Sequence, residues 1–342
     1  MRRPVSRPRR ALLAATITAA ALILTGCSTA GPSAEKADPA AGESATTITH
    51  ALGAAKITGT PKRIVTLGQG SAETAIALGT IPVGMEEYPW GSDDTGYLPW
   101  VHEAVTKAGG TLPKTFTGNT ELDVETIADL EPDLILAPWS GVTQEQYDVL
   151  DKIAPTIAYP EKPWTITWDD QITTIGKAMG KPAEAADLIT EINDTLANAK
   201  RPEYAGVSFS YIYNTGPGTL GVFFPGEQRV AMAAALGLTV DPVVDTFTET
   251  EGTDSALIGL ENADKLANSD LIFTFYSDQA NRAEIEAQPL YHAIPAIAAG
   301  AVVAPTDQPF VTGSSMINPL TVPWALERYV PLIDDALAHV SR

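Results

Sequence analysis

The chain has 342 residues, and its 42 aspartates and glutamates outnumber its 22 lysines and arginines, which gives a formal net charge of −20. A surface of this charge repels nucleic acid and anionic lipid headgroups, so nucleic acid is not expected as a partner. Cysteine occurs once, at Cys27, which excludes iron–sulfur clusters and thiolate metal sites.

The first 26 residues are predicted to form a lipoprotein signal peptide. Five arginines and no acidic residue lie within residues 1–10, and an uncharged apolar run follows. The run is shorter than the roughly 20 residues of a membrane-spanning helix. It ends in Leu-Thr-Gly-Cys, which resembles the bacterial lipobox, so Cys27 is the expected lipidation site. The alternative is an uncleaved anchor, and the export route, Sec or Tat, stays open.

Residues 27–56 are predicted to form a flexible tether. Alanine, serine, threonine, glycine and glutamate dominate this stretch, and large apolar residues are scarce. Such a segment buries too little apolar surface to offset the entropy lost on ordering. The tether and the lipid are expected to hold the folded part outside the cytoplasm, on the outer face of the cell membrane.

Residues 57–165 are predicted to form an N-terminal α/β lobe. Short apolar runs with the character of buried strands alternate with helical patterns along this stretch. The predicted strands are 63–67, 81–86, 132–138 and 156–159, and the predicted helices are 71–79, 122–130 and 144–154. This alternation indicates a mainly parallel sheet covered by helices on both faces.

Residues 166–201 are predicted to form a helical linker, because apolar residues recur at helical spacing and Gly180-Lys181-Pro182 supplies a stop and a restart. Residues 202–342 resume the alternation and are predicted to form a C-terminal α/β lobe. Its predicted strands are 207–213, 270–276 and 301–305, and its helices lie near 227–237, at 260–267 and from 323 onward. A single large doubly wound sheet is the alternative.

The segment 63–79, RIVTLGQGSAETAIALG, invites a dinucleotide-binding hypothesis, because an apolar strand is followed by Gly68 and Gly70. Glu73 stands where that fingerprint needs a third small residue, and its charge opposes a bound pyrophosphate. The sequence contains no G-x-S-x-G elbow, and its four histidines are scattered. No enzyme hypothesis gains support, so the turn is expected to form a wall of a ligand cleft.

Four segments carry a family resemblance: residues 60–85, 122–138, 150–159 and 260–275. Together with the lipobox they resemble the lipoprotein substrate-binding proteins of ABC importers for ferric siderophores and vitamin B12. The resemblance runs from about Pro61 to the C-terminus. It implies two Rossmann-like lobes joined by a long helix, with a ligand cleft between them. It also implies a non-enzymatic monomer without a cofactor, which captures a ferric siderophore and delivers it to an ABC permease for iron uptake.

Ligands of parallel α/β sheets bind beyond the carboxyl ends of the strands. The aromatic and polar side chains that follow predicted strands are therefore the candidate ligand-binding residues: Gln69, Trp90, Trp139, Tyr213, Arg229, Tyr276, Arg282 and Phe310. Core packing is the alternative for the aromatic residues, and surface ion pairs are the alternative for the arginines. Trp164 and Trp168, where the chain enters the linking helix, are expected to pack against the lobes.

The scarcity of arginines near the expected cleft favours a neutral or cationic ferric hydroxamate over an anionic catecholate. Vitamin B12 and haem are the alternatives within the same family. The resemblance also implies that Glu125 and Glu261, one per lobe, meet arginines of the permease. Gly259 replaces the serine usual two residues before Glu261. Both glutamates lie near predicted helix starts, where the helix dipole also favours an acid.

Overall fold

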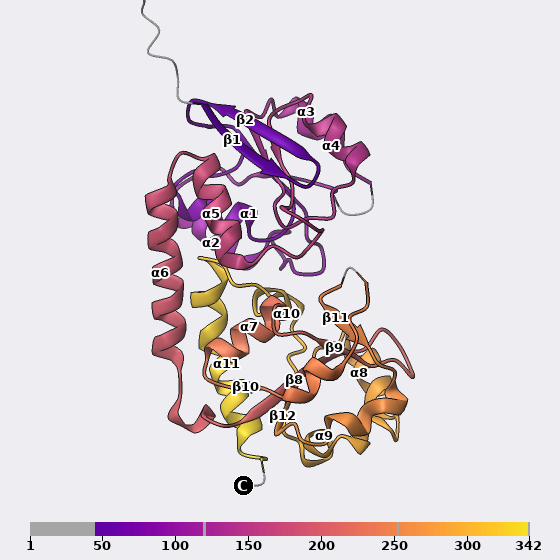
Figure 1. Cartoon of the computed structure of the whole chain (residues 1–342). Helices are drawn as coiled ribbons and strands as arrows, with labels where there is room; N and C mark the ends of the chain where they lie inside the picture. The colour runs from indigo at the N-terminus through magenta and orange to yellow at the C-terminus, as the bar shows by residue number, and fades with distance from the viewer. Residues whose placement is uncertain (1–44, 119–120, 252, 341–342) are drawn as a thin grey trace, which may run out of the picture. The chain divides into compact units, whose positions relative to one another are not determined.

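The structure is a computed structural model that describes residues 45–118, 121–251 and 253–340 (Figure 1). These residues belong to one compact unit. The predicted signal peptide and the lipidation site Cys27 lie outside the described residues.

The first sheet has five parallel strands in the order β5-β4-β3-β6-β7. The central strands β3 and β6 are fully buried, as expected of a sheet covered on both faces. The strands are β3 (Ile64–Thr66), β4 (Gly84–Glu86), β5 (Lys114–Phe116), β6 (Leu134–Leu136) and β7 (Thr156–Ile157). The helices are α1 (Ser71–Ala77), α2 (Pro99–Lys107), α3 (Val124–Asp129) and α4 (Gln144–Leu150). The predicted α/β alternation is confirmed here, although β5 and α2 were not predicted.

Two helices, α5 (Trp168–Ala178) and α6 (Pro182–Ala199), follow the first sheet. Gly180, at a φ of 69°, ends the first helix, and Pro182 opens the second. The Cβ of Ala185 packs against Gly176, where any side chain would clash with it. Helix α5 contacts α1, and α6 contacts α11 (Thr321–Leu337) (Figure 1). The two linker helices therefore pack against helices from both the N-terminal and the C-terminal part of the chain.

The second sheet has the order β11-β9-β8-β12-β13, with β10 also paired to β8. Its strands are β8 (Ser208–Tyr213), β9 (Gly221–Phe223), β10 (Thr239–Val240), β11 (Ser255–Leu257), β12 (Leu271–Phe273) and β13 (Val302–Val303). Strands β10, β8, β12 and β13 are parallel, whereas β9 and β11 add an antiparallel edge that the sequence analysis missed. The lobe is α/β as predicted.

The C-terminal part also contains helices, several of which contact strands of the second sheet, and short 3₁₀ segments. The helices are α7 (Gln228–Ala235), α8 (Gln279–Glu286), α9 (Pro295–Ala299), α10 (Gln308–Gly313) and α11. The 3₁₀ segments are Pro202–Tyr204, Pro242–Thr246, Leu260–Leu266 and Tyr291–Ala293. The helix expected at 260–267 is thus a 3₁₀ segment with a kink at Asn262.

A β-hairpin corrects the predicted tether. Strands β1 (Ala45–His50) and β2 (Gly53–Thr58) pair antiparallel, and the hairpin contacts β7 and α5. Ala55 and Ile57, two positions apart on β2, are buried at 1% and 3% exposure, so one face of the strand joins the core. The tether prediction is therefore wrong for residues 45–56. The other predicted domain boundaries stay a prediction.

Candidate ligand-binding pocket

A pocket of about 600 Å³ lies at the carboxyl ends of the first sheet, within the range typical of small-molecule sites. Its lining comes from three parts of the chain: loops after β3, β4 and β6, the segment before α5, and the surroundings of β9, α7 and β11. The lining residues are Gln69, Glu86, Tyr88, Trp139, Pro163, Trp164, Thr165, Phe223, Glu227, Arg229, Thr253 and Asp254. Both lobes therefore contribute to one site.

The turn after β3 is held tightly against its neighbours. The Gly68 N–H donates to Glu86 Oε2 at 2.8 Å, and Gln171 Nε2 donates to the Gln69 carbonyl at 2.8 Å. Gly68 has a φ of 73°, and a Cβ there would lie 1.8 Å from the Trp139 carbonyl oxygen. Only glycine allows this conformation and this approach, so it fixes the pocket wall that carries Gln69 and Trp139.

Aromatic side chains form opposite parts of the pocket. The rings of Trp139 and Trp164 meet edge to face, with centroids 4.7 Å apart and an interplanar angle of 69°. Phe223, at the end of β9, contributes from the other lobe. Such rings supply apolar contact area with defined geometry, which suits a bulky ligand that is partly apolar.

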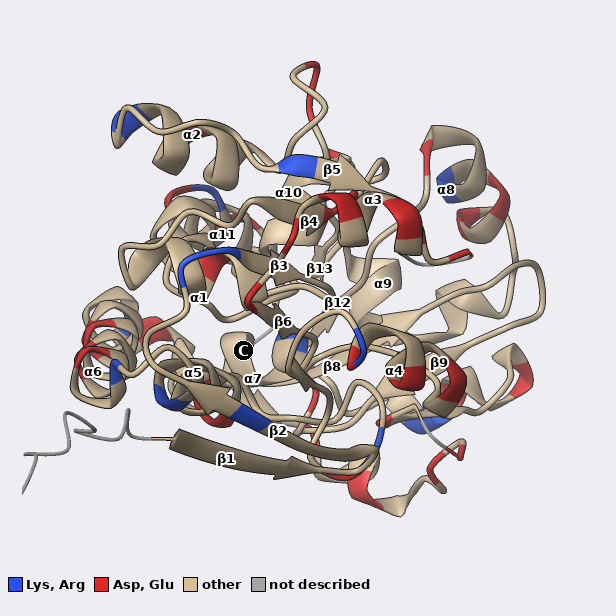
Figure 2. Ribbon diagram, turned by 90° about the horizontal axis from the view of Figure 1, so that it is seen from above, with Lys and Arg blue, Asp and Glu red and all other residues tan. Residues whose placement is uncertain are grey.

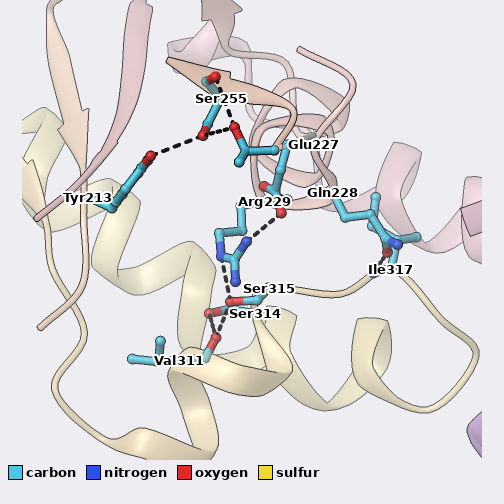
Figure 3. Close-up of polar contacts among 10 residues, drawn as sticks. Tyr213, Glu227, Gln228, Arg229, Ser255, Val311, Ser314, Ser315 and Ile317 are labelled. Atoms are coloured by element: carbon cyan, nitrogen blue, oxygen red, sulfur yellow. Dashed lines mark hydrogen bonds and ion pairs between the residues drawn. The ribbon is translucent and has the colours of Figure 1, made fainter. Parts of the chain in front are cut away.

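Arg229 is tied down within the protein (Figure 3). Its guanidinium pairs with Glu227, and its Nε donates to Ser315 Oγ at 3.1 Å. The same group lies over the rings of Phe223, at 4.9 Å, and Phe275, at 5.6 Å. Arg229 is the one cation among the lining residues that the structure describes, and its charge is already balanced by Glu227.

Three carboxyl groups line the pocket, and burial raises the pKa of each. Glu86 is 8% exposed and accepts hydrogen bonds from the Gly68 N–H and, at 3.3 Å, from the Tyr88 hydroxyl. Burial raises the pKa of Glu227 despite the opposing charge of Arg229. Burial and the charges of Glu227 and Glu249 raise the pKa of Asp254 to about 6. The lining thus holds three acids against one arginine, a set that suits a neutral or cationic ligand better than an anionic one.

The raised pKa of Asp254 predicts a pH-dependent stability difference between the wild type and Asp254→Asn. A carboxyl whose pKa rises from 3.8 to about 6 on folding stabilises the fold fully below about pH 4 and loses that contribution as pH rises through about 6. At pH 7 we expect Asp254→Asn to be more stable than the wild type by about 1–2 kcal/mol, after allowance for solvent screening at this partly exposed site. Urea unfolding at pH 4 and pH 7 measures it, and a difference that is the same at both pH values contradicts the assignment.

Three of the eight predicted ligand-binding residues, Gln69, Trp139 and Arg229, are brought together in this pocket. Trp90 is 39% exposed and is not among the described lining residues. Tyr213 is also not among the described lining residues: its ring is 4.7 Å from that of Phe223, and its hydroxyl is 3.0 Å from Ser255 Oγ (Figure 3). Ligand contact by these five residues stays a prediction.

For the other three candidates the structure favours packing or an ion pair over ligand contact. Tyr276 is 2% exposed, and its hydroxyl is 2.8 Å from that of Tyr291. Phe310 is 3% exposed and packs against Trp324 and Tyr329. Arg282 pairs with Glu286, one turn along α8, at 2.8 Å and lies over the Tyr276 ring. A position after a strand can equally belong to the core or to a surface ion pair, and ligand contact by these three residues stays a prediction.

Six lining residues whose side chains shape the site were not predicted from the sequence: Glu86, Tyr88, Trp164, Phe223, Glu227 and Asp254. Tyr88 follows a strand and Phe223 ends one, so both could have been predicted from the rule that ligands bind beyond the carboxyl ends of the strands. The three acids gave none, because the chain has 42 acidic residues. Trp164 was expected to pack against the lobes, yet it is 44% exposed.

The two glutamates predicted to dock the permease lie away from the pocket. Glu125 is exposed in the first turn of α3, whose N-cap Asp123 accepts the Thr126 N–H at 2.9 Å. Glu261 is exposed at the start of the 3₁₀ segment Leu260–Leu266. Acidic residues mark α3 in the view of Figure 2. Their docking role stays a prediction.

The described residues contain no helix long and apolar enough to cross a membrane. Within the same ranges no three or more histidine, cysteine or acidic side chains gather in a way that suits a metal ion.

Residues 64–309 match the family model described as periplasmic binding protein, and the chain belongs to this family. The probable siderophore-binding lipoprotein YfiY of Bacillus subtilis (strain 168) is 31% identical over 183 residues, which cover 53% of this chain and 52% of YfiY. The ferric enterobactin-binding periplasmic protein FepB of Escherichia coli O6:H1 is 28% identical over 219 residues, which cover 60% of this chain and 65% of FepB. The chain thus spans about half to two thirds of these relatives.

Among solved structures, PiaA of Streptococcus pneumoniae TIGR4 in complex with ferrichrome is similar to this chain. The two are 30% identical, with a TM-score of 0.79, and the match covers 86% of this chain and 99% of PiaA. This similarity supports the two-lobed α/β fold over nearly the whole of the described residues.

Proposed function

We propose that this protein is an extracytoplasmic substrate-binding lipoprotein that captures a ferric siderophore and delivers it to an ABC permease for iron uptake. The observation that carries the proposal is the aromatic pocket, with three acids and one paired arginine, that both lobes line in a chain of the periplasmic binding protein family. The similarity to PiaA, whose structure holds ferrichrome, supports it. The proposed role is binding and delivery without catalysis, by a monomer anchored through lipid on Cys27.

The charges of the pocket favour a neutral or cationic ferric hydroxamate. In such a complex the hydroxamates balance the charge of Fe(III), whereas a ferric tris-catecholate keeps a net negative charge. Glu86 and Asp254 would repel that charge, and Arg229 is already paired with Glu227. A ferric catecholate is kept as a test arm because FepB is named for enterobactin. Vitamin B12 and haem are the remaining alternatives, and no described feature of the pocket favours either.

Titration of the ligand-free protein tests this proposal. Ferrioxamine B, ferrichrome, a ferric catecholate, cobalamin and haem are each added while tryptophan fluorescence is followed, with calorimetry to confirm affinity. We expect both hydroxamates to bind more tightly than the catecholate. Preference for the catecholate would refute the charge argument, and preference for cobalamin or haem would refute the siderophore assignment.

Trp139→Ala is expected to weaken hydroxamate binding by about 1–3 kcal/mol, because a half-buried aromatic ring that a bound ligand covers carries a large share of binding energy. Its unfolding midpoint should change little, since Trp139 lines the pocket rather than filling the core. The matched control is Leu290→Ala, at an apolar side chain that is 51% exposed and is not among the described lining residues, which should bind as the wild type does. An unchanged affinity with a large loss of stability would assign Trp139 to packing.

A further inference from the structure

The backbone of Trp164 adopts a conformation that bulky residues rarely take. Trp164 has a φ of 65°, in the segment between β7 and α5. In this left-handed region the Cβ crowds a carbonyl oxygen, so glycine or asparagine normally occupies such positions. The indole is also 44% exposed, so burial in the core does not compensate for the strained backbone. Neither the local backbone nor burial in the core therefore explains the choice of tryptophan.

The indole of Trp164 faces the candidate pocket. It lines the pocket and meets the ring of Trp139 edge to face at 4.7 Å. Gly141 makes room for it, because a Cβ on Gly141 would lie 2.6 Å from Trp164 Cζ2, and all three nearest atoms belong to this indole. The loop that carries Trp139 is thus shaped to receive the second indole.

We propose that Trp164 is a ligand-binding residue that acts with Trp139 as a two-indole wall against the hydrocarbon part of a ferric hydroxamate. The proposal rests on the proposed function. Strained residues persist where a functional site needs them, and here the strain directs a large apolar ring toward the pocket. The cost to the ligand-free protein is then offset when the ligand covers the exposed indole.

The first test is Trp164→Asn, because asparagine tolerates a positive φ. Calorimetric titration with ferrioxamine B and ferrichrome should show affinity at least tenfold weaker than that of the wild type. The unfolding midpoint should stay the same or rise, since the strained and exposed ring is gone. Trp164→Phe should recover most of the affinity. Wild-type affinity in Trp164→Asn with a lowered midpoint would make Trp164 a packing residue and overturn the inference.

The second test moves the indole without removing it. Gly141 does not have a positive φ, so an alanine there is not strained by its backbone conformation. The main cost of Gly141→Ala should be the steric clash of the new Cβ with the Trp164 ring, which must move. We expect a similar loss of affinity, and the double variant with Trp164→Asn should lose no more than Trp164→Asn alone. Additive losses would overturn the inference while the proposed function stands. A wild-type protein that binds neither hydroxamate would overturn both.

Discussion

Gly68→Ala is expected to lower the free energy of unfolding by about 3–5 kcal/mol and to abolish hydroxamate binding. Two costs add: an alanine at a φ of 73° is strained, and its Cβ would lie 1.8 Å from the Trp139 carbonyl oxygen. The neighbour in conflict is backbone, which a side-chain rotation does not move. Relief therefore requires the turn after β3 to separate from the loop that carries Trp139. That movement opens the pocket wall and weakens the hydrogen bond from the Gly68 N–H to Glu86.

Gly180→Ala is the matched control for this prediction. Gly180 has a φ of 69°, and a Cβ there would meet nothing within 4 Å. The stability loss in this variant therefore comes only from the strained backbone conformation. We expect a loss of about 1–2 kcal/mol with unchanged ligand affinity. Urea unfolding and calorimetric titration of both variants measure the two effects. If Gly68→Ala loses no more stability than Gly180→Ala, the close approach to Trp139 has no energetic weight.

The parts of the fold that the sequence predicted are those whose signal is local. Strands β3 and β6 are buried apolar runs followed by helical patterns, and Gly180 with Pro182 punctuates the linker. The hairpin of β1 and β2 was missed because its residues are small and polar, and only docking against β7 and α5 makes Ala55 and Ile57 a core face. Strands β9 and β11 are as short as β3 and β6, but each begins with glycine or serine and ends at a partly or fully exposed residue, so neither is a buried apolar run that the sequence could reveal.

The candidate site shows the same division. Gln69 and Trp139 were predicted because they follow buried strands of a parallel sheet, a rule that needs no tertiary knowledge. The sequence could not distinguish Asp254 and Glu227 from the other acidic residues. They matter because the fold brings them, from different parts of the chain, to the lining of one pocket. The role of Trp164 depends on a backbone angle and on the space above Gly141, and neither can be seen in a sequence.

Simultaneous replacement of Glu125 and Glu261 by alanine is expected to leave hydroxamate affinity nearly intact while uptake into cells falls at least tenfold. Both side chains are exposed at the starts of helical segments, and neither is among the described residues that line the pocket. On the proposed function they pair with arginines of the permease, one per lobe. Loss of such interface pairs slows docking to the permease and removes the contacts that orient the two proteins. For a desolvated pair this loss weakens the association by about 2–5 kcal/mol.

Stabilisation of the helix dipole is the competing explanation for both glutamates. The variant Glu145→Ala distinguishes this explanation from permease docking. Glu145 is exposed in the first turn of α4, as Glu125 is in the first turn of α3, so Glu145→Ala removes the same dipole contribution without touching the proposed docking residues. Calorimetry gives the affinity, and uptake of radiolabelled iron in cells that express each variant gives the delivery. The single variants should be milder than the double variant, and reversal to lysine should be worse than alanine, because a like charge then faces the arginine. Normal uptake by the double variant would contradict the docking role, and so would an equal defect in Glu145→Ala. Either result would mean that Glu125 and Glu261 only stabilise the helical segments that they begin, and that the permease contacts other residues of the two lobes.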